Sequence, residues 1–503
     1  MGGGLMQLVA YGAQDIYLTG NPQITFFKVV YRRHTNFSME TIQQTINGTA
    51  TIGSSANSGT VTISRNGDLV SNVYVRCDQD TSNGIKGEKL VTEVEIEIGG
   101  QRIDRHYEEW LQVWSELTTP SSKADGYAYM TGNLDNTFVT AAGHDTGNQT
   151  QQQSIMLPLQ FWFCRNPGLA LPLIALQYHE VKLKFTWGID TDVSRDGTSA
   201  TPTCEVWADY IYLDTDERRR FAQVSHEYLI EQLQRQNEGS AKSSYKLNFN
   251  HPVKELLWTN TSTNLTTQRA KLQLNGHDRF AEQDREYFQL RQPYQYHTSV
   301  PGFNIKERFL PTFINPIDTG IVAHNDTVTA TKAKLEKTGV NAGKQITFDS
   351  AVAGYTPRVG DVLLISVGGL NDNDAFAAGE LNQHVVQLKS VSADADPVCV
   401  FVTAINAAHV FSNLTDDDGL SVTCIARTQY RTNRCCTSLI KDINAYSFAL
   451  KPEEHQPSGT CNFSRIDNAQ LAFSDSTTID NIYAVNYNVL RIMSGMGGLA
   501  YSN

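Results

Sequence analysis

Apolar and polar residues alternate along much of this chain. Val94–Ile98 places valine and isoleucine on one face and glutamates on the other, and Val181–Phe185 and Lys271–Asn275 repeat the pattern with other polar residues. A period of two is typical of a strand with one face in a core and the other in solvent, as in antiparallel sheets. The pattern therefore predicts a chain built mainly of antiparallel strands.

Helical patterns are few. One spans about Asp104–Leu117, and a shorter one lies near Arg279–Leu290. A third runs from Asp216 to Gln236 with apolar residues spaced about one turn apart, which predicts a linking helix with one buried face. These apolar residues are Phe221, Val224, Tyr228, Leu229 and Leu233.

Three blocks occur twice along the chain and keep their order. The first is a strand, a polar turn and a strand, and the second is an alternating strand, a glycine turn and a short acidic-aromatic helix. The third is an apolar strand, a proline and glycine turn, and a further strand. Ordered repetition predicts two copies of one β-unit. The pairs are Thr60–Arg76 with Ser244–Thr259, Glu95–Leu117 with Lys271–Pro293, and Leu159–Phe185 with Tyr446–Phe473.

The second copy is longer between its second and third blocks. The excess spans about residues 321–440 and has strand patterns of its own, so we expect an inserted β-rich domain on the solvent-facing end of the second unit. Val362, Leu363, Leu364 and Ile365 need burial, which indicates a small separate core. The strand patterns are Lys344–Phe348, Val359–Val367, His384–Val391, Val398–Thr403 and Leu420–Ala426.

Charge argues against a protein that coats nucleic acid. The 503-residue chain carries a formal net charge of −12, and only 19% of its residues are charged. Neutralising phosphates requires a broad basic face. Two short basic clusters, at Lys28 with Arg32–His34 and at Arg218–Arg220, are interpreted as solvated surface or local ion pairs.

No pattern of catalytic or metal-binding residues is found. The histidines, among them His106, His144, His179 and His226, stand apart, and no H-x-H pair occurs. Asp416–Gly419 lacks the alternating spacing of a calcium loop and is interpreted as a solvated turn. Glu108 and Glu109 are interpreted as the solvated side of a short helix. The eight cysteines show no C-x-x-C pair, which favours reduced thiols. We predict no catalytic residues, cofactor or metal ion.

Four longer stretches are similar to the major capsid proteins of nucleocytoplasmic large DNA viruses. They are the opening Gly3–Phe37, then Gly99–Asp104, Asn250–Trp258 and Phe448–Phe463. The resemblance extends over most of the chain outside residues 321–440.

The resemblance implies two consecutive eight-stranded antiparallel jelly rolls. On this basis residues 1–22 form an N-terminal arm, 23–213 the first jelly roll and 214–242 a linker helix. Residues 243–503 form the second jelly roll, with 321–440 as its inserted domain.

The resemblance also implies a structural subunit of the virion. Three copies would form a pseudo-hexagonal capsomer that tiles an icosahedral shell and is assembled in the host cytoplasm. Its expected partners are itself, neighbouring capsomers, minor capsid proteins and the internal viral membrane, without direct contact to nucleic acid.

Two other functions remain open at this point. A secreted lectin-like β-sandwich would need a secretion signal, and Met1–Met6 lacks the basic and long apolar regions of one. A hydrolase on a double jelly roll would need an acid pair or a metal cluster in a pocket. The size of the purified protein separates these functions, because only the capsid protein is expected to be a stable trimer.

Overall fold

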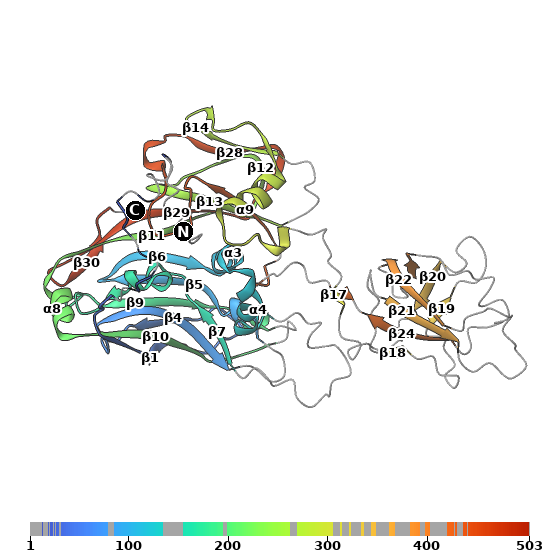
Figure 1. Ribbon diagram of the computed structural model, residues 1–503, viewed down its shortest axis with the longest axis horizontal. Helices are drawn as coiled ribbons and strands as arrows, with labels where there is room; N and C mark the ends of the chain where they lie inside the picture. Colours follow the sequence, from blue (N-terminus) through green and yellow to red (C-terminus); the bar gives the residue numbers. More distant parts are fainter. Residues whose placement is uncertain are drawn as a thin grey trace, which may run out of the picture.

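The computed structural model describes residues 32–78, 85–133, 154–194, 199–261, 269–304 and 441–501, with shorter pieces between 13 and 29 and between 312 and 439. Most of these residues lie in two β-sandwiches that stand side by side, and a smaller sheet lies apart from them (Figure 1). We call the sandwich from β1 to β10 unit 1. Unit 2 comprises β11–β16 and β26–β30.

Unit 1 has two facing sheets of antiparallel strands. One has the order β1-β10-β4-β7 with β8 beside β4, and the other has the order β2-β3-β9-β5-β6. The strands are β1 (Phe37–Gln44), β2 (Ile46–Gly48), β3 (Ser58–Thr62), β4 (Leu69–Asp78), β5 (Val91–Ile98), β6 (Gln101–Tyr107), β7 (Ser154–Pro158), β8 (Leu171–Pro172), β9 (Val181–Trp187) and β10 (Cys204–Leu213).

Unit 2 also has two facing antiparallel sheets. One has the order β11-β29-β13-β26 with β27 and β30 attached, and the other has the order β12-β28-β14-β15 with β16 attached. The strands are β11 (His226–Asn237), β12 (Ala241–Lys246), β13 (Pro252–Asn260), β14 (Arg269–Leu274), β15 (His277–Asp278), β16 (Gln283–Asp284), β26 (Asp442–Ser447), β27 (Cys461–Asn462), β28 (Ala469–Thr478), β29 (Asn481–Met493) and β30 (Met496–Leu499).

The two units have the same connectivity. The order β1-β10-β4-β7 corresponds to β11-β29-β13-β26, and β3-β9-β5-β6 corresponds to β12-β28-β14-β15. Two facing sheets connected in this way are the jelly-roll arrangement. The predicted duplication is confirmed, because Glu95–Leu117 begins in β5 and Lys271–Pro293 begins in the equivalent β14. Short strands such as β2, β8 and β27 extend the sheets beyond this shared frame.

One hairpin turn is repeated in both units. Gly99 and Gly100 between β5 and β6 have φ angles of +58° and +84°, and Asn275 and Gly276 between β14 and β15 have φ angles of +51° and +79°. Two successive left-handed residues make the tight turn that matches the twist of paired strands. At Gly99 a side chain is also excluded by space, since a Cβ atom would lie 2.2 Å from Nδ1 of His179.

The predicted alternating strands are confirmed. In β5 the side chains of Val94, Ile96 and Ile98 are fully buried in the core of unit 1, while the glutamates between them face outward. Val181, Leu183 and Phe185 of β9 join the same core. Unit 2 has a separate core between its own two sheets, to which Leu272 of β14 belongs.

Two of the predicted helices are displaced. The helix expected at Asp104–Leu117 is α3 (Glu108–Thr118), because the residues before it pair with β5 as strand β6. The helix expected at Arg279–Leu290 is wrong in its first half. Residues in β15 and β16 pair with β14, and the chain is helical from residue 285 onward, through η3 (Tyr287–Arg291) and α9 (Gln292–Tyr296).

The predicted linker helix over 214–242 is also wrong in its second half. Helix α8 spans only Thr215–Gln223, and β11 then pairs with β29 from His226 opposite Ile492 to Asn237 opposite Asn481. Ile230, Glu231 and Gln232 are buried in succession, so both faces of this strand are covered. A strand covered on both faces loses the period of two and can imitate a helical pattern.

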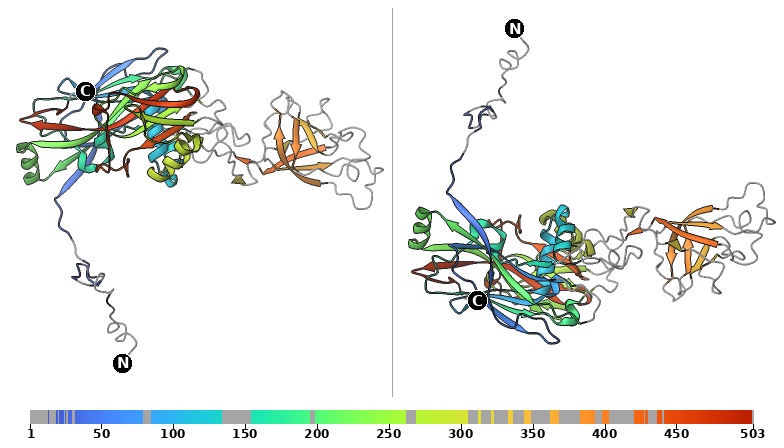
Figure 2. Two further views of the ribbon diagram at one scale, coloured as in Figure 1. Left: turned by 90° about the horizontal axis from the view of Figure 1, so that it is seen from above. Right: turned by 90° about the horizontal axis from the view of Figure 1, so that it is seen from below.

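The predicted insertion contains a sheet of its own, with strand order β18-β24-β21-β22-β23-β20-β19. It lies at the opposite end of the molecule from α8, and the two views of Figure 2 also show it apart from the sandwiches. All five predicted strands are confirmed, and Leu363 is buried with Ile346, Leu388 and Phe401. The strands are β18 (Ile321–Val322), β19 (Ala333–Leu335), β20 (Gln345–Phe348), β21 (Val362–Val367), β22 (Gln383–Val391), β23 (Val398–Phe401) and β24 (Leu420–Ala426).

Other predicted segments lie largely outside the described residues. These include most of the N-terminal arm, His144 and Asp416–Gly419. The domain boundaries predicted at residue 22, between the arm and the first jelly roll, and at residue 213, before the linker, stay predictions.

Candidate functional site at the seam between the units

Helix α3 of unit 1 packs on the outer face of the β11-β29-β13-β26 sheet of unit 2. We call this contact the seam. Trp110 lies at its centre, with its ring centroid 5.5 Å from that of Trp114 and 5.4 Å from that of Tyr483. The cluster removes a large apolar area from water and thereby favours the contact. It comprises Trp110, Val113, Trp114 and Leu117 of α3 with Leu257, Leu439, Ile443, Ala445, Tyr483 and Val485.

Polar groups join β6 of unit 1 to β11 of unit 2. The backbone N–H of Leu233 donates to Oδ1 of Asp104 at 3.0 Å, and the side-chain amide of Gln232 donates to the carbonyl of Ile103. Oδ2 of the same aspartate lies 3.0 Å from Nε2 of His106, which is stacked on Phe161. Buried polar groups are costly unless they are paired, so these contacts fix one alignment of the two strands.

Glu231 of β11 forms ion pairs with both units. Its Oε2 lies 2.7 Å from Nη1 of Arg165 in unit 1, and its Oε1 lies 2.7 Å from Nζ of Lys254 in unit 2. The Lys254 side chain is fully buried. The Arg165 guanidinium also lies 3.9 Å above the ring of Trp114, a cation–π contact. One carboxylate therefore balances two cations inside the seam.

A second buried group of charges lies nearby in unit 2. His297 lies between two carboxylates, with Nε2 3.4 Å from Glu255 and Nδ1 3.1 Å from Glu453. Burial raises the pKa of Glu255. Burial opposes ionisation of Glu453 as well, but hydrogen bonds from His297 and Thr298 outweigh it and lower the pKa of that carboxyl.

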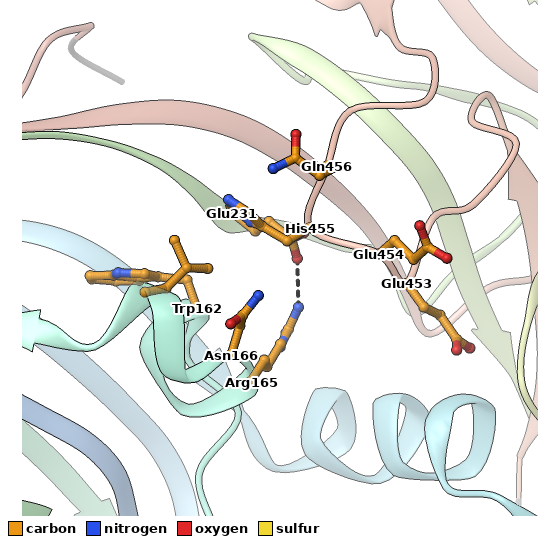
Figure 3. Close-up of a pocket in the computed structure, with 9 residues that line it drawn as sticks. Trp162, Arg165, Asn166, Glu231, Glu453, Glu454, His455 and Gln456 are labelled. Atoms are coloured by element: carbon orange, nitrogen blue, oxygen red, sulfur yellow. Dashed lines mark hydrogen bonds and ion pairs between the residues drawn. The ribbon is translucent and has the colours of Figure 1, made fainter. Parts of the chain in front are cut away.

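A cavity of about 380 Å³ opens beside this charged group, between helical turn α6 (Trp162–Arg165) of unit 1 and the 453–456 loop of unit 2 (Figure 3). The two most buried carboxylates in its lining already have partners. Glu231 forms the ion pairs described above, and Glu453 accepts hydrogen bonds from His297 and Thr298. Burial lowers the pKa of His455. The lining consists of Trp162, Arg165, Asn166, Leu169, Glu231, Glu453, Glu454, His455 and Gln456. The arrangement joins the two units, and it offers no activated nucleophile.

Two buried glutamates of unit 1 hold the segment that returns from the insertion. Glu116 accepts hydrogen bonds from the backbone N–H (2.8 Å) and hydroxyl (2.7 Å) of Thr437, and Glu88 accepts the equivalent bonds from Ser438 at 2.9 and 3.0 Å. Burial raises the pKa of Glu88 to about 8, although the bonds from Ser438 oppose the shift. Leu439 packs within the seam cluster, so this end of the predicted insertion lies in the seam.

The residues considered for chemistry have structural contacts instead. The imidazole of His179 lies within hydrogen-bond distance of the backbone of Gly497, and that of His226 lies within hydrogen-bond distance of the carbonyl of Phe221. Glu108 pairs with Lys89, while Glu109 is not simply solvated but pairs with Lys441 at 2.6 Å. Within the described ranges, no group of three or more His, Cys, Asp or Glu side chains is placed to hold a metal ion.

One of the two basic clusters forms an ion pair in the structure. Arg218 on α8 pairs with Asp68 at 3.0 Å, which fits the local ion pair proposed for that cluster. The seam residues Arg165, Glu231 and Lys254 were missed by the sequence analysis. One signal for them exists, because Lys254 and Glu255 interrupt an otherwise apolar strand.

Comparison with known proteins decides the family. Residues 25–214 match the family model of the major capsid protein N-terminus. Residues 217–269 and 435–498 match that of the large eukaryotic DNA virus major capsid protein. The major capsid protein of Pyramimonas orientalis virus is 44% identical, with all of both chains aligned. This chain belongs to the major capsid proteins of large eukaryotic DNA viruses.

Other relatives agree with this assignment. The major capsid protein of Paramecium bursaria Chlorella virus 1 is 38% identical over the whole of both chains. A chain of the PBCV-1 virus capsid model has a TM-score of 0.58 and 31% identity, and covers 95% of this chain and 100% of its own length.

Capsid proteins of this family are structural components and not enzymes, and this chain is likewise a structural protein of the virion. Such proteins assemble with each other into the shell. In the part of the chain that the structure describes, no helix is both long and apolar enough to cross a membrane.

Proposed function

We propose that three copies of this capsid protein form a pseudo-hexagonal capsomer, and that such capsomers tile the icosahedral shell of a large DNA virus. The observation that carries the proposal is the shared connectivity of units 1 and 2. Three chains with two similar units each would present six similar units around a three-fold axis. Closed cyclic symmetry is the usual arrangement of identical subunits.

The surroundings of the capsomer are part of the same proposal. Neighbouring capsomers, minor capsid proteins and the internal viral membrane are its expected partners, and assembly takes place in the host cytoplasm. The net charge of −12 supports an absence of direct contact with nucleic acid.

The inserted sheet is proposed to face outward from the shell. Its strands form a core apart from units 1 and 2, and unit 1 has the same connectivity without it. An element that the shared frame does not need is best placed where it does not disturb packing between capsomers.

The oligomeric state tests the proposal. Light scattering of the purified protein at micromolar concentration should give three times the chain mass of 55.9 kDa. An obligate contact of this kind is expected to bury more than about 2,000 Å². A particle with the mass of one chain at that concentration would contradict the capsomer.

A further inference from the structure

Two cysteines of unit 1 lie directly opposite each other on neighbouring strands. Cys77 is the last residue but one of β4, and Cys204 is the first residue of β10. The antiparallel ladder between these strands pairs the two residues with each other. Elsewhere in the described strands a cysteine faces an aliphatic residue, as Cys461 does opposite Val253. The distance between Cys77 and Cys204 along the sequence hides their pairing, which arises only when β4 and β10 meet.

The two cysteines form a pair without hydrogen bonds between their backbones. The backbone N–H of Cys204 donates to the carbonyl of Ala50 at 2.8 Å and therefore points away from β4. The N–H and C=O of one strand residue point to the same side, so neither group of Cys204 bonds to Cys77. In such a pair the Cα atoms lie about 4.5 Å apart and the side chains are closest. A disulfide requires a Cα separation of roughly 4.4–6.8 Å, which this backbone arrangement meets.

Both side chains also point to the same face of the sheet. Cys77 and Cys204 are 1% and 2% exposed, and both belong to the hydrophobic core between the two sheets of unit 1. Both are free thiols in the structure. Burial raises the pKa of Cys77 to about 12, and burial together with the neighbouring Cys77 raises the pKa of Cys204. Thiolate is therefore scarce at neutral pH, and reaction of the folded protein is slow.

The jelly-roll frame does not require cysteine at this place. In unit 2 the corresponding strands are β13 and β29, and their ladder ends with Thr259 opposite Asn481. These two residues are buried as well. The frame thus accepts other buried pairs here, and the two thiols of unit 1 supply a chemistry that the fold itself does not need.

We propose that Cys77 and Cys204 form a disulfide bond between β4 and β10 when the protein is exposed to a small-molecule disulfide. The thiolate of one cysteine attacks a sulfur atom of the small disulfide, whose S–S bond breaks and releases one thiolate. The thiolate of the other cysteine then attacks the protein sulfur of this mixed disulfide, forms the cross-strand bond and releases the second small thiolate. The protons of both cysteines end on the released thiols, and an electron pair passes from the protein to the small disulfide.

The place of the pair at the ends of both strands makes this reaction feasible inside a core. Strand ends open locally at a lower free-energy cost than strand centres, so a reagent can reach the thiols without global unfolding. After the strand ends close again, the bond would be buried and protected from reductants.

The bond would enclose much of unit 1 in a covalent loop. The segment between the two cysteines contains helix α3 and Arg165, which contact unit 2 at the seam. A cross-link stabilises mainly by restricting the unfolded chain, and long loops gain most. Cytosolic thiols are kept reduced, whereas disulfides persist on virions outside the cell. We therefore expect the bond to form after release from the host, and only this timing rests on the proposed assembly in the cytoplasm.

Peptide mapping of the full-length protein tests the bond directly. The reduced, folded protein is incubated with oxidised glutathione, then alkylated in denaturant and digested. We expect a linked peptide that contains Cys77 and Cys204 and that separates on reduction. Recovery of both residues as free thiols, or of each bound to glutathione, would overturn the proposal.

Thermal unfolding tests whether the bond stabilises the fold. Oxidation should raise the unfolding midpoint of the unmodified protein by about 5–10 °C. Cys204→Ala should show no such rise, whereas the matched control Cys164→Ala, which removes another thiol of unit 1, should keep it. An equal rise in Cys204→Ala would assign the effect to other cysteines and contradict the proposal. If Cys204→Ala does not fold, the linked peptide of the unmodified protein still decides the result.

The timing is tested in samples from infected cells and from released particles, each alkylated at harvest. The linked peptide should be found in the particles and not in the cytoplasm. Its presence in both samples would contradict the timing, and its absence from the particles would overturn the bond in the virion. None of these results depends on the mass of the assembled protein, so failure of the disulfide and failure of the trimer are distinguishable.

Discussion

At the scale of single residues, Glu231 is the charge on which the contact between the units depends. It is the carboxylate that pairs with both Arg165 and Lys254, and the lysine is fully buried. A buried ion pair contributes little net stability when intact, but removal of one partner leaves a charge without compensation in a low-dielectric site. Here the loss of one carboxylate would leave two such cations.

We expect Glu231→Gln to lower the free energy of unfolding by about 3 kcal/mol. Glu454→Gln is the matched control, because this glutamate pairs with Lys451 at the surface and its loss should cost less than about 1 kcal/mol. Urea unfolding followed by tryptophan fluorescence at equal protein concentration measures both. Equal losses in the two variants would contradict the role assigned to Glu231.

Glu88 should make stability depend on pH. Burial raises its pKa to about 8 in the folded chain, well above the ordinary value of 4.5. The folded state then keeps a proton that the unfolded state has lost, so stability from this group is present below pH 4.5 and is lost as pH rises to about 8.

Glu88→Gln removes this titration. Relative to the unmodified protein, the variant should gain thermal stability steadily from pH 5 to pH 8. Glu286→Gln, at an exposed position, should run parallel to the unmodified protein over the same range. A difference between Glu88→Gln and the unmodified protein that does not change with pH would show that the Glu88 pKa is not raised.

At the scale of elements, the sequence predicted best those strands that have one face in water. Val94–Ile98 and Val181–Phe185 are strands as expected, and so are the five strands of the insertion. Strand β11 was predicted as helix because the seam covers both of its faces, and nothing local in the sequence records that contact. The same reason explains the missed site residues. Arg165 and Glu231 are 66 positions apart and meet only when the two units pack together.

The insertion should be removable if its return segment is kept. Replacement of residues 314–430 by a Gly/Ser linker retains the bonds of Thr437 and Ser438 to Glu116 and Glu88, and we expect trimers of reduced mass. A deletion that extends through Lys441 also removes Leu439 and the Lys441–Glu109 ion pair. It should therefore give less soluble protein, as measured by gel filtration. Loss of soluble trimer in the shorter deletion would mean that the inserted sheet is part of the shell-forming core.

At the scale of the whole molecule, the chain has two similar units whose exposed surfaces are not similar. The shared strand order makes the units near-equivalent in shape, while the acidic helix α3 and the Arg291-bearing segment η3–α9 make them different in charge. Shape alone would allow several ways of pairing the units. Surface charge is a common source of specificity among contacts of similar shape.

The seam has a further consequence for the rate and concentration dependence of assembly. Because both units belong to one polypeptide, the contact between them forms as an intramolecular step, at an effective local concentration that dilution does not change. In a ring of six units made from three chains, half of the contacts between units would be established in this way before any two chains meet. Ring formation would then depend on the third power of the protein concentration, whereas six separate units would face a sixth-power dependence. A tandem duplication would therefore let the proposed capsomer nucleate at much lower expression levels than its units could reach as separate proteins.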